Sequence, residues 1–144
     1  MSALQPSVYL FVHVIWSVHQ RESLLTRPVR KVLFVHMQKD GEEKGLRILM
    51  INGVEDHIHV LVQLMPSQNL IQVVRSIKTS SSQWLNENKL LTGEFQWEEG
   101  YSALSVSPSS VKQVKDYIEK QEEHHKTRTL DAELEAFVRL KEQI

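Results

Sequence analysis

The sequence predicts one α+β domain in which helices cover an antiparallel sheet. The chain has 144 residues, an ordinary length for a single domain. Its apolar residues follow the two-residue period of strands in some segments and the roughly 3.6-residue period of helices in others. Apolar residues make up 41% and charged residues 24% of the chain, which excludes disordered and fibrous classes. No low-complexity linker divides it, so we expect one domain over residues 1–144.

The first half of the chain predicts a strand, a helix and a hairpin. Residues 8–16 are apolar on both faces, as in a central strand covered from both sides. A helix is expected from an N-cap at Thr26 to about Lys44, with Gly45 at its C-terminal stop or an earlier end at Gly41. Residues 46–51 then alternate as a second strand, and residues 52–53, Asn-Gly, are typical of the turn that leads into a third strand at 57–64.

The second half predicts a helix, a strand and two further helices. Apolar residues at helical spacing indicate a helix over 70–85 that covers the sheet. Residues 95–106 indicate a fourth strand, broken near Gly100, and Ser107 with Pro108 opens another helix. A last helix contains Leu134, Phe137 and Val138. The order β-α-β-β-α-β-α-α matches a ferredoxin-like α+β sandwich with additional C-terminal helices.

Composition excludes several kinds of chemistry and location. The chain has no cysteine, which excludes disulfides, thiolate metal sites and cysteine nucleophiles. Its most apolar stretch, residues 8–16, is far shorter than the ~20 residues of a membrane helix, and the preceding segment lacks the features of a signal peptide. We therefore expect a cytoplasmic protein with no membrane partner. The net charge of −1 argues against coating of duplex DNA, so any nucleic-acid contact must be local.

Two pairs of residues are candidates for chemistry. His57 and His59 are two apart on a predicted strand, so both imidazoles point the same way and can share one metal ion. Tyr117 and Gln121 are four apart on one predicted helix, so they lie on the same helix face. Taken singly, the histidines also fit a half-exposed strand, and Tyr117 also fits the boundary of the core. Only the combination indicates a site.

The motifs that contain these pairs resemble a known family. Residues 56–59 (Asp-His-Ile-His) and 117–121 (Tyr-Ile-Glu-Lys-Gln), in this order, are similar to the motifs of the single-tyrosine HUH transposases of bacterial insertion sequences, a group that includes the REP-associated tyrosine transposases. The resemblance extends to residues 12–16 and 100–107. It covers roughly residues 8–125 of the chain.

The resemblance implies a metal-dependent transposase and endonuclease that cuts and rejoins single-stranded DNA, usually near a hairpin, through a 5′-phosphotyrosine. By position in the motifs, Tyr117 would be the catalytic nucleophile. His57, His59 and Gln121 would hold the metal, Mg²⁺ or Mn²⁺. The family also implies a homodimer with composite active sites, in which the tyrosine helix of one subunit completes the histidine site of its partner.

Other polar residues give weaker indications. Four basic side chains could bind DNA phosphates locally, although solvated helix faces also explain them: Arg75, Lys78, Lys112 and Lys115. His13 is expected to be a core histidine rather than a DNA contact. His124 and His125 lie about one turn beyond Gln121, where they could reach DNA or metal, or act as cations at a helix end.

Two other function classes fit parts of the pattern. Histidine-triad nucleotide hydrolases also carry alternating histidines on a strand, but the place of the third histidine is taken by Leu61. A non-catalytic or domesticated single-stranded nucleic-acid-binding domain could use the same fold, since ferredoxin-like sheets also stack RNA bases on exposed aromatic residues. The strand positions here are mostly aliphatic. A covalent bond between protein and oligonucleotide would distinguish the nuclease from a binder.

Overall fold

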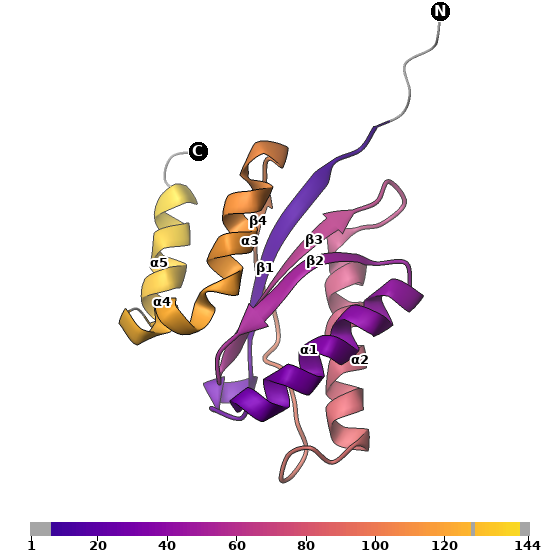
Figure 1. Ribbon diagram of the computed structural model, residues 1–144, viewed down its shortest axis with the longest axis vertical. Coiled ribbons are helices and arrows are strands. Elements are labelled where there is room, and N and C mark those ends of the chain that lie inside the picture. The colour runs from indigo at the N-terminus through magenta and orange to yellow at the C-terminus, as the bar shows by residue number, and fades with distance from the viewer. Residues whose placement is uncertain (1–6, 128, 142–144) are drawn as a thin grey trace, which may run out of the picture.

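The computed structural model describes residues 7–127 and 129–141. Four antiparallel strands form one sheet in the order β2-β3-β1-β4, with helices on both of its faces (Figure 1). Two β-α-β units interlock in this order, because each helix connects two strands that are separated by a strand of the other unit. The predicted ferredoxin-like α+β fold with extra C-terminal helices is confirmed.

Strand β1 (Leu10–Ser17) lies at the centre of the sheet. It pairs with β3 (His57–Leu64) on one side and with β4 (Ser102–Val106) on the other, while β2 (Arg47–Gly53) extends the sheet beyond β3. Residues 13–16 are buried, as expected of a strand covered from both sides, although the strand begins two residues later than predicted. The register places Ile15 opposite His59 and His13 opposite Leu61. His13 and His59 are therefore diagonal neighbours on one face.

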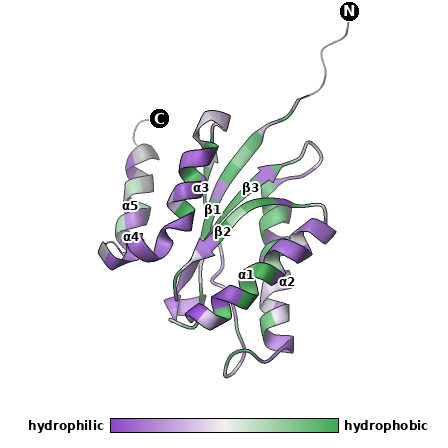
Figure 2. Cartoon of the chain, viewed as in Figure 1, coloured by the Kyte–Doolittle hydropathy of each residue, from purple (hydrophilic) through white to green (hydrophobic). Residues whose placement is uncertain are grey.

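Helices α1 (Arg27–Glu43) and α2 (Leu70–Glu87) cover the other face, where the main hydrophobic core lies. Val14, Ile58 and Val60 point into this core from the strands and are fully buried. Figure 2 shows hydrophobic residues along the strands and hydrophilic residues on the outer side of α1. The predicted N-cap and stop of α1 lie at Thr26 and just beyond Lys44, where Gly45 has a φ of 74°.

The C-terminal part of the chain covers the histidine-bearing face with α3 (Val111–Glu119), α4 (Gln121–Thr127) and α5 (Leu130–Lys141) (Figure 1). A second, smaller core forms there around Leu61, Val106 and Ile118. In α5, the side chains of the predicted residues Phe137 and Val138 lie outside the described part of the chain. Within residues 7–127 and 129–141, no helix has both the length and the apolar character needed to cross a membrane.

The predicted strand over residues 95–106 is wrong in its first half. Only Ser102–Val106 is a strand, and a single bridge joins Trp97 to Val18. Phe95 and Trp97 are 2% and 8% exposed, because they pack into the main core from an irregular segment. The Trp97 indole Nε1 donates to the Ser81 hydroxyl of α2 at 2.9 Å. The alternation of Phe95 and Trp97 with polar residues therefore reflects burial in the core, not strand pairing.

The prediction of one continuous helix through Tyr117 and Gln121 is also wrong. Helix α3 ends at Glu119, and Lys120 has a φ of −97° and a ψ of 25°, outside the helical region. Gln121 then begins α4. Helical spacing therefore does not account for the positions of Tyr117 and Gln121. Their proximity depends on this break and on the packing of α5.

The hairpin between β2 and β3 turns later than predicted, because Asn52 and Gly53 belong to the end of β2. A Cβ atom on Gly53 would lie 2.4 Å from the carbonyl oxygen of His57 and 2.9 Å from the Cα of Ile58. Glycine is required here by close approach of two backbones.

We expect Gly53→Ala to lower the free energy of unfolding by about 1–3 kcal/mol. Urea unfolding measures this change, and an unaltered midpoint would contradict it.

Candidate metal centre and tyrosine site

The two motif histidines lie side by side on β3. Their spacing turns both imidazoles to the face covered by α3, and both side chains are fully buried. Their ring centroids are 5.3 Å apart. Leu61, at the place of a third histidine in a histidine-triad hydrolase, is fully buried in the smaller core. The third histidine that a histidine-triad hydrolase needs is therefore missing at this position.

Each motif histidine is oriented by a partner on its Nδ1 atom. The Asp56 carboxylate lies 2.8 Å from Nδ1 of His57, and Nε2 of His13 lies 2.8 Å from Nδ1 of His59. The hydrogen bond with His57 lowers the pKa of Asp56, and burial lowers the pKa of His13 to about 3. These partners leave Nε2 of both motif histidines directed at one point. Such outer partners commonly fix the orientation of metal-binding histidines.

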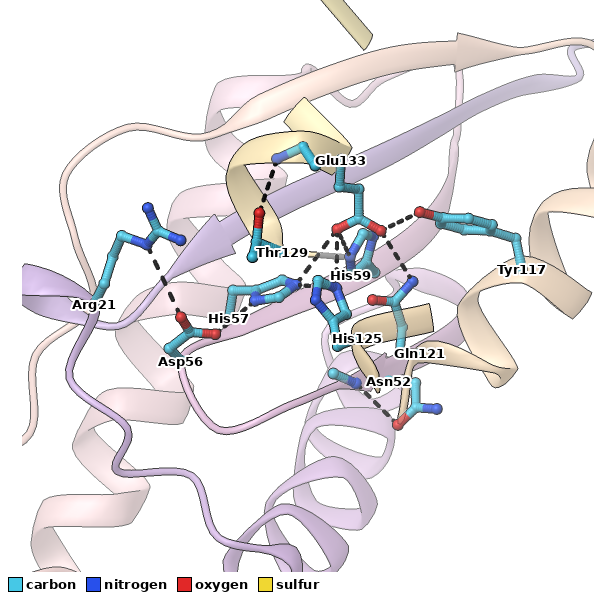
Figure 3. Close-up of polar contacts among 12 residues, drawn as sticks. Arg21, Asn52, Asp56, His57, His59, Tyr117, Gln121, His125, Thr129 and Glu133 are labelled. Atoms are coloured by element: carbon cyan, nitrogen blue, oxygen red, sulfur yellow. Dashed lines mark hydrogen bonds and ion pairs between the residues drawn. The ribbon is translucent and has the colours of Figure 1, made fainter. Parts of the chain in front are cut away.

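Helices α4 and α5 add two residues at that point, His125 and Glu133 (Figure 3). Atom Oε1 of Glu133 lies 3.5 Å from Nε2 of His57, 3.0 Å from Nε2 of His59 and 3.3 Å from Nε2 of His125. The Glu133 side chain is fully buried. Three imidazoles and one carboxylate therefore converge from a strand and two helices.

This cluster fits a metal ion by geometry and by donor type. The four ligand atoms of His57, His59, His125 and Glu133 all lie within 4.8 Å of one another. Donors held about 2.1 Å from an ion lie about 3.0–3.4 Å apart, depending on coordination geometry. The distances from Oε1 of Glu133 to the three nitrogens, 3.0–3.5 Å, are close to that range. Imidazole and carboxylate are common ligands of divalent transition metals.

The carboxylate of Glu133 and the imidazole of His57 each favour the charged form of the other. Burial opposes ionisation of Glu133, but hydrogen bonds with His57 and His59 outweigh it and hold the pKa of this carboxyl far below its usual value. Burial likewise favours the neutral form of His57, but Asp56 and Glu133 raise its pKa above the usual value. The pKa of His59 is lowered, chiefly by burial. The site therefore contains a carboxylate anion surrounded by imidazoles.

Tyr117 reaches this cluster from α3. Its hydroxyl donates to Oε2 of Glu133, and its ring centroid lies 6.0 Å from that of His59. The ring of His124 stacks on it, with centroids 4.4 Å apart. A groove of about 540 Å³ between β4 and α3 is lined by Tyr117, His13 and Val114, among others. One copy of the chain therefore brings its own tyrosine to its own histidine pair.

Both motif histidines and Tyr117 lie within a longer match to one known family. A family model described as "Transposase IS200 like" matches residues 7–121, which is most of the chain. The chain belongs to this family. The match includes both histidines of β3, Tyr117 and Gln121, whereas His125 and Glu133 lie beyond its end.

Curated relatives of this IS200-like transposase are also described as transposases. The ISDra2 transposase TnpA of Deinococcus radiodurans is 27% identical over 114 residues, which are 76% of this chain and 81% of that protein. The transposase for insertion sequence element IS200 of Salmonella typhimurium is 28% identical over 120 residues, 79% of this chain and 78% of that protein. Both alignments span most of each partner.

Two solved structures share the fold of this transposase. A crystal structure of a transposase from Deinococcus radiodurans R1 superposes with a TM-score of 0.63 and 23% identity, over 84% of this chain and 98% of that one. A REP-associated tyrosine transposase bound to a REP hairpin gives a TM-score of 0.58 and 14% identity, over 83% of this chain and 72% of that one. Because both identities are below 25%, these two similarities show a shared fold and no more.

Gln121 of the transposase lies in the cluster, but with an unexpected partner. Its amide Nε2 donates to Oε2 of Glu133 at 3.4 Å. Its Oε1 is buried and has no hydrogen-bond partner within the described residues. A buried acceptor without a donor is unfavourable, and a cation would satisfy it. The orphaned oxygen therefore agrees with the predicted role of Gln121 as a metal ligand.

The four predicted phosphate-binding residues fall into two separate groups. Arg75 and Lys78 belong to α2, on the face of the sheet opposite the cluster, and Nζ of Lys78 donates to the carbonyl oxygens of Glu98 and Gly100 at 2.6 and 3.0 Å. Lys112 and Lys115 belong to α3, the helix that carries Tyr117. Only the second pair shares a helix with the candidate nucleophile.

A buried arginine that sequence reasoning missed attaches α4 to α1. Arg30 is 5% exposed, and its guanidinium donates to the carbonyl oxygen of Leu25 at 2.6 Å and to Glu122 at 2.8 Å. Arg27 also donates to Glu122, and the hydrogen bonds from the two arginines lower the pKa of this carboxyl, that from Arg30 most. Because Glu122 follows Gln121 directly, this contact fixes the start of α4 beside the cluster.

Proposed function

We propose that this IS200-like transposase cleaves and rejoins single-stranded DNA, with Tyr117 as the nucleophile and a divalent metal ion held by His57, His59 and Gln121. The observation that carries the proposal is the meeting of the phenol and both motif histidines at one buried carboxylate. His125, which lies 3.1 Å from His57 between their Nε2 atoms, adds a further ligand that the motif does not include.

The two motif histidines and Tyr117 supply complementary parts of a phosphoryl transfer. A phosphodiester is negatively charged and repels nucleophiles, and a phenol with a pKa near ~10 is weakly nucleophilic at neutral pH. A divalent cation held by His57, His59 and Gln121 would neutralise phosphate charge and supply a Lewis acid. Neutral imidazoles leave that positive charge intact. Tyr117, on a separate helix, approaches the same point and needs no movement of the sheet to reach a phosphate there.

The proposed step conserves atoms and charge. The phenolic oxygen of Tyr117 forms a bond to phosphorus, and the bond from phosphorus to the 3′ oxygen breaks. The phenol loses a proton, and the departing 3′ oxygen gains one. The products are a 5′-phosphotyrosine and a free 3′-hydroxyl. Because the ester bond is retained on the protein, attack by a 3′-hydroxyl reverses the step without ATP, so that cutting and joining use the same chemistry.

The donor set favours Mn²⁺ over Mg²⁺ as the ion. Mg²⁺ prefers an octahedron of oxygen ligands and water, whereas imidazole nitrogen binds first-row transition metals more readily. His57, His59 and His125 offer three such nitrogens within one cluster. We therefore propose Mn²⁺ as the more effective of the two ions.

We propose single-stranded DNA with hairpin ends as the partner. The REP-associated relative of similar fold is bound to a REP hairpin. The groove beside Tyr117 offers an approach for a single strand, and a net charge of −1 requires that phosphate contacts be local, for example at Lys112 and Lys115 on the same helix. A homodimer, as the family resemblance implies, remains part of the proposal. The described chain places Tyr117 at its own histidines, so we propose active sites within one chain, with composite sites as the alternative.

A denaturation-resistant adduct tests this function. The protein is incubated with labelled single-stranded oligonucleotides that contain hairpins, in Mn²⁺, in Mg²⁺ or with a chelator, and then run on a denaturing gel. We expect a slower, labelled protein band with Mn²⁺, less with Mg²⁺ and none with the chelator, because the uncompensated phosphate charge then blocks attack. Reversible binding with no adduct under any metal condition would identify a nucleic-acid binder and contradict the proposal.

A further inference from the structure

Glu133 differs from the rest of the site in its origin and its place in the chain. It is carried by α5, which the match to the family model, residues 7–121, does not include. The shared catalytic motifs therefore lie on one part of the chain, and the carboxylate between them comes from another. A residue outside the region that matches the family model is not expected to be required for the chemistry that the family shares.

The two oxygens of Glu133 face two different parts of the machinery. Oε1 faces the metal-binding nitrogens, 3.0 Å from His59 and 3.3 Å from His125. Oε2 accepts the hydroxyl of Tyr117 and the amide nitrogen of Gln121. Figure 3 shows the carboxylate between the histidines and the tyrosine. It connects the nucleophile to the metal-binding side chains and fills the space between them.

A scissile phosphate needs that same position. Attack requires the phosphorus to lie about 3–3.5 Å from the phenolic oxygen, with the orbitals aligned. A non-bridging phosphate oxygen would at the same time have to reach an ion held by His57 and His59. A phosphate and a carboxylate are both anions whose oxygens can bridge a cation and a hydroxyl. The two groups cannot occupy the position together, since Glu133 already contacts Tyr117 on one side and His59 on the other.

Apart from those of Glu133 itself, the described contacts that hold α5 in place are modest. Leu130 is 5% exposed, and it lines a shallow hollow together with Ile15 and Trp16 of β1. Asp131 forms an ion pair with Arg21 at 2.8 Å, on side chains that are 75% and 40% exposed. An exposed pair of this kind contributes little to stability. No described residue of α5 belongs to either hydrophobic core cluster. We therefore expect the sheet and both cores to persist when α5 withdraws.

We propose that Glu133 is an internal substitute for the scissile phosphate, and that α5 must withdraw before DNA can enter the site. This inference rests on the proposed function, because it assigns a phosphate position between the metal ligands and Tyr117. The resting chain is closed, and the fraction of molecules with α5 withdrawn sets the apparent affinity for DNA.

The decisive variant is Glu133→Ala in the full-length chain, with Glu135→Ala on the exposed side of the same helix as its matched control. Binding is measured first, by fluorescence anisotropy of a labelled hairpin oligonucleotide in the Tyr117→Phe background with a chelator present, so that neither cleavage nor metal affects the result. We expect Glu133→Ala to bind at least about tenfold more tightly, because the closed state is lost. The control should bind like the parent. Equal affinity of Glu133→Ala and the parent would overturn the inference.

Adduct formation and metal affinity then distinguish an internal substitute for the phosphate from a required metal ligand. With Tyr117 intact, Glu133→Ala should form the adduct faster than the wild type. Asp131→Asn, which breaks only the exposed ion pair, should give a smaller gain of up to about fivefold. If Glu133→Ala instead loses Mn²⁺ affinity and adduct together, Glu133 is a required ligand and the inference is wrong. If Glu133→Ala binds DNA more tightly but neither the wild type nor any variant forms an adduct, the inference about Glu133 is upheld and the proposed function is contradicted.

Discussion

Tyr117→Phe is expected to abolish the covalent protein to DNA adduct, with a loss of at least about a thousandfold in its rate of formation. The change removes one oxygen atom, the one that would bond to phosphorus. It also removes a donor to Glu133, so the binding affinity for DNA should not fall. Denaturing gels measure the adduct, and anisotropy measures binding by the same protein preparation.

Tyr101→Phe is the matched control for this experiment. Tyr101 is 36% exposed, precedes β4 and, among its described contacts, has none with the histidine cluster. The control should form the adduct at the wild-type rate. An adduct that persists in Tyr117→Phe would require another nucleophile.

The double variant His57→Ala, His59→Ala is expected to weaken Mn²⁺ binding by about 100-fold or more and to remove the adduct. Even the loss of an outer partner of a metal ligand commonly costs 10- to 100-fold in affinity, so loss of two ligands should cost more. Isothermal titration calorimetry measures the affinity. His36→Ala is the control, because His36 stacks on Trp84 on the opposite face of the sheet, with ring centroids 4.5 Å apart. Unchanged metal affinity in the double variant would place the ion elsewhere.

A mixture of this double variant with Tyr117→Phe distinguishes sites within one chain from composite sites. The described arrangement brings Tyr117 to the histidines of its own chain, so we expect the mixture to stay inactive. Recovery of adduct formation in the mixture would show that one subunit supplies the tyrosine and another the histidines, as the family resemblance implies.

The fold could be predicted because most elements have a local signal. The apolar period identified the central strand, α2 and β3, and Gly45 marked the end of α1. The errors arose where tertiary packing imitates a local pattern. Phe95 and Trp97 alternate like strand residues because both fill the core from an irregular segment. Asn-Gly at 52–53 resembles a turn, but Gly53 is glycine because a backbone carbonyl of β3 lies against it.

The site could be predicted only in part, because half of it depends on contacts that are distant in sequence. Spacing placed His57 and His59 on one face, and the motif resemblance added Tyr117 and Gln121. The role of His13 follows from strand register, which alternation alone does not specify. Glu133 lies 74 residues from His59 along the chain, and its acidic helix resembles a solvated surface. No local pattern separates it from Glu135.

The central claim is that Tyr117 itself carries the cleaved DNA through its 5′ phosphate. Peptide mapping by mass spectrometry tests it most directly, after the trapped adduct is digested with protease and nuclease. The account predicts that the peptide containing Tyr117 gains the mass of a 5′-phosphate-linked nucleotide, and that the released oligonucleotide ends in a 3′-hydroxyl. A nucleotide found on another residue, or a released strand that ends in a 3′ phosphate, would contradict it.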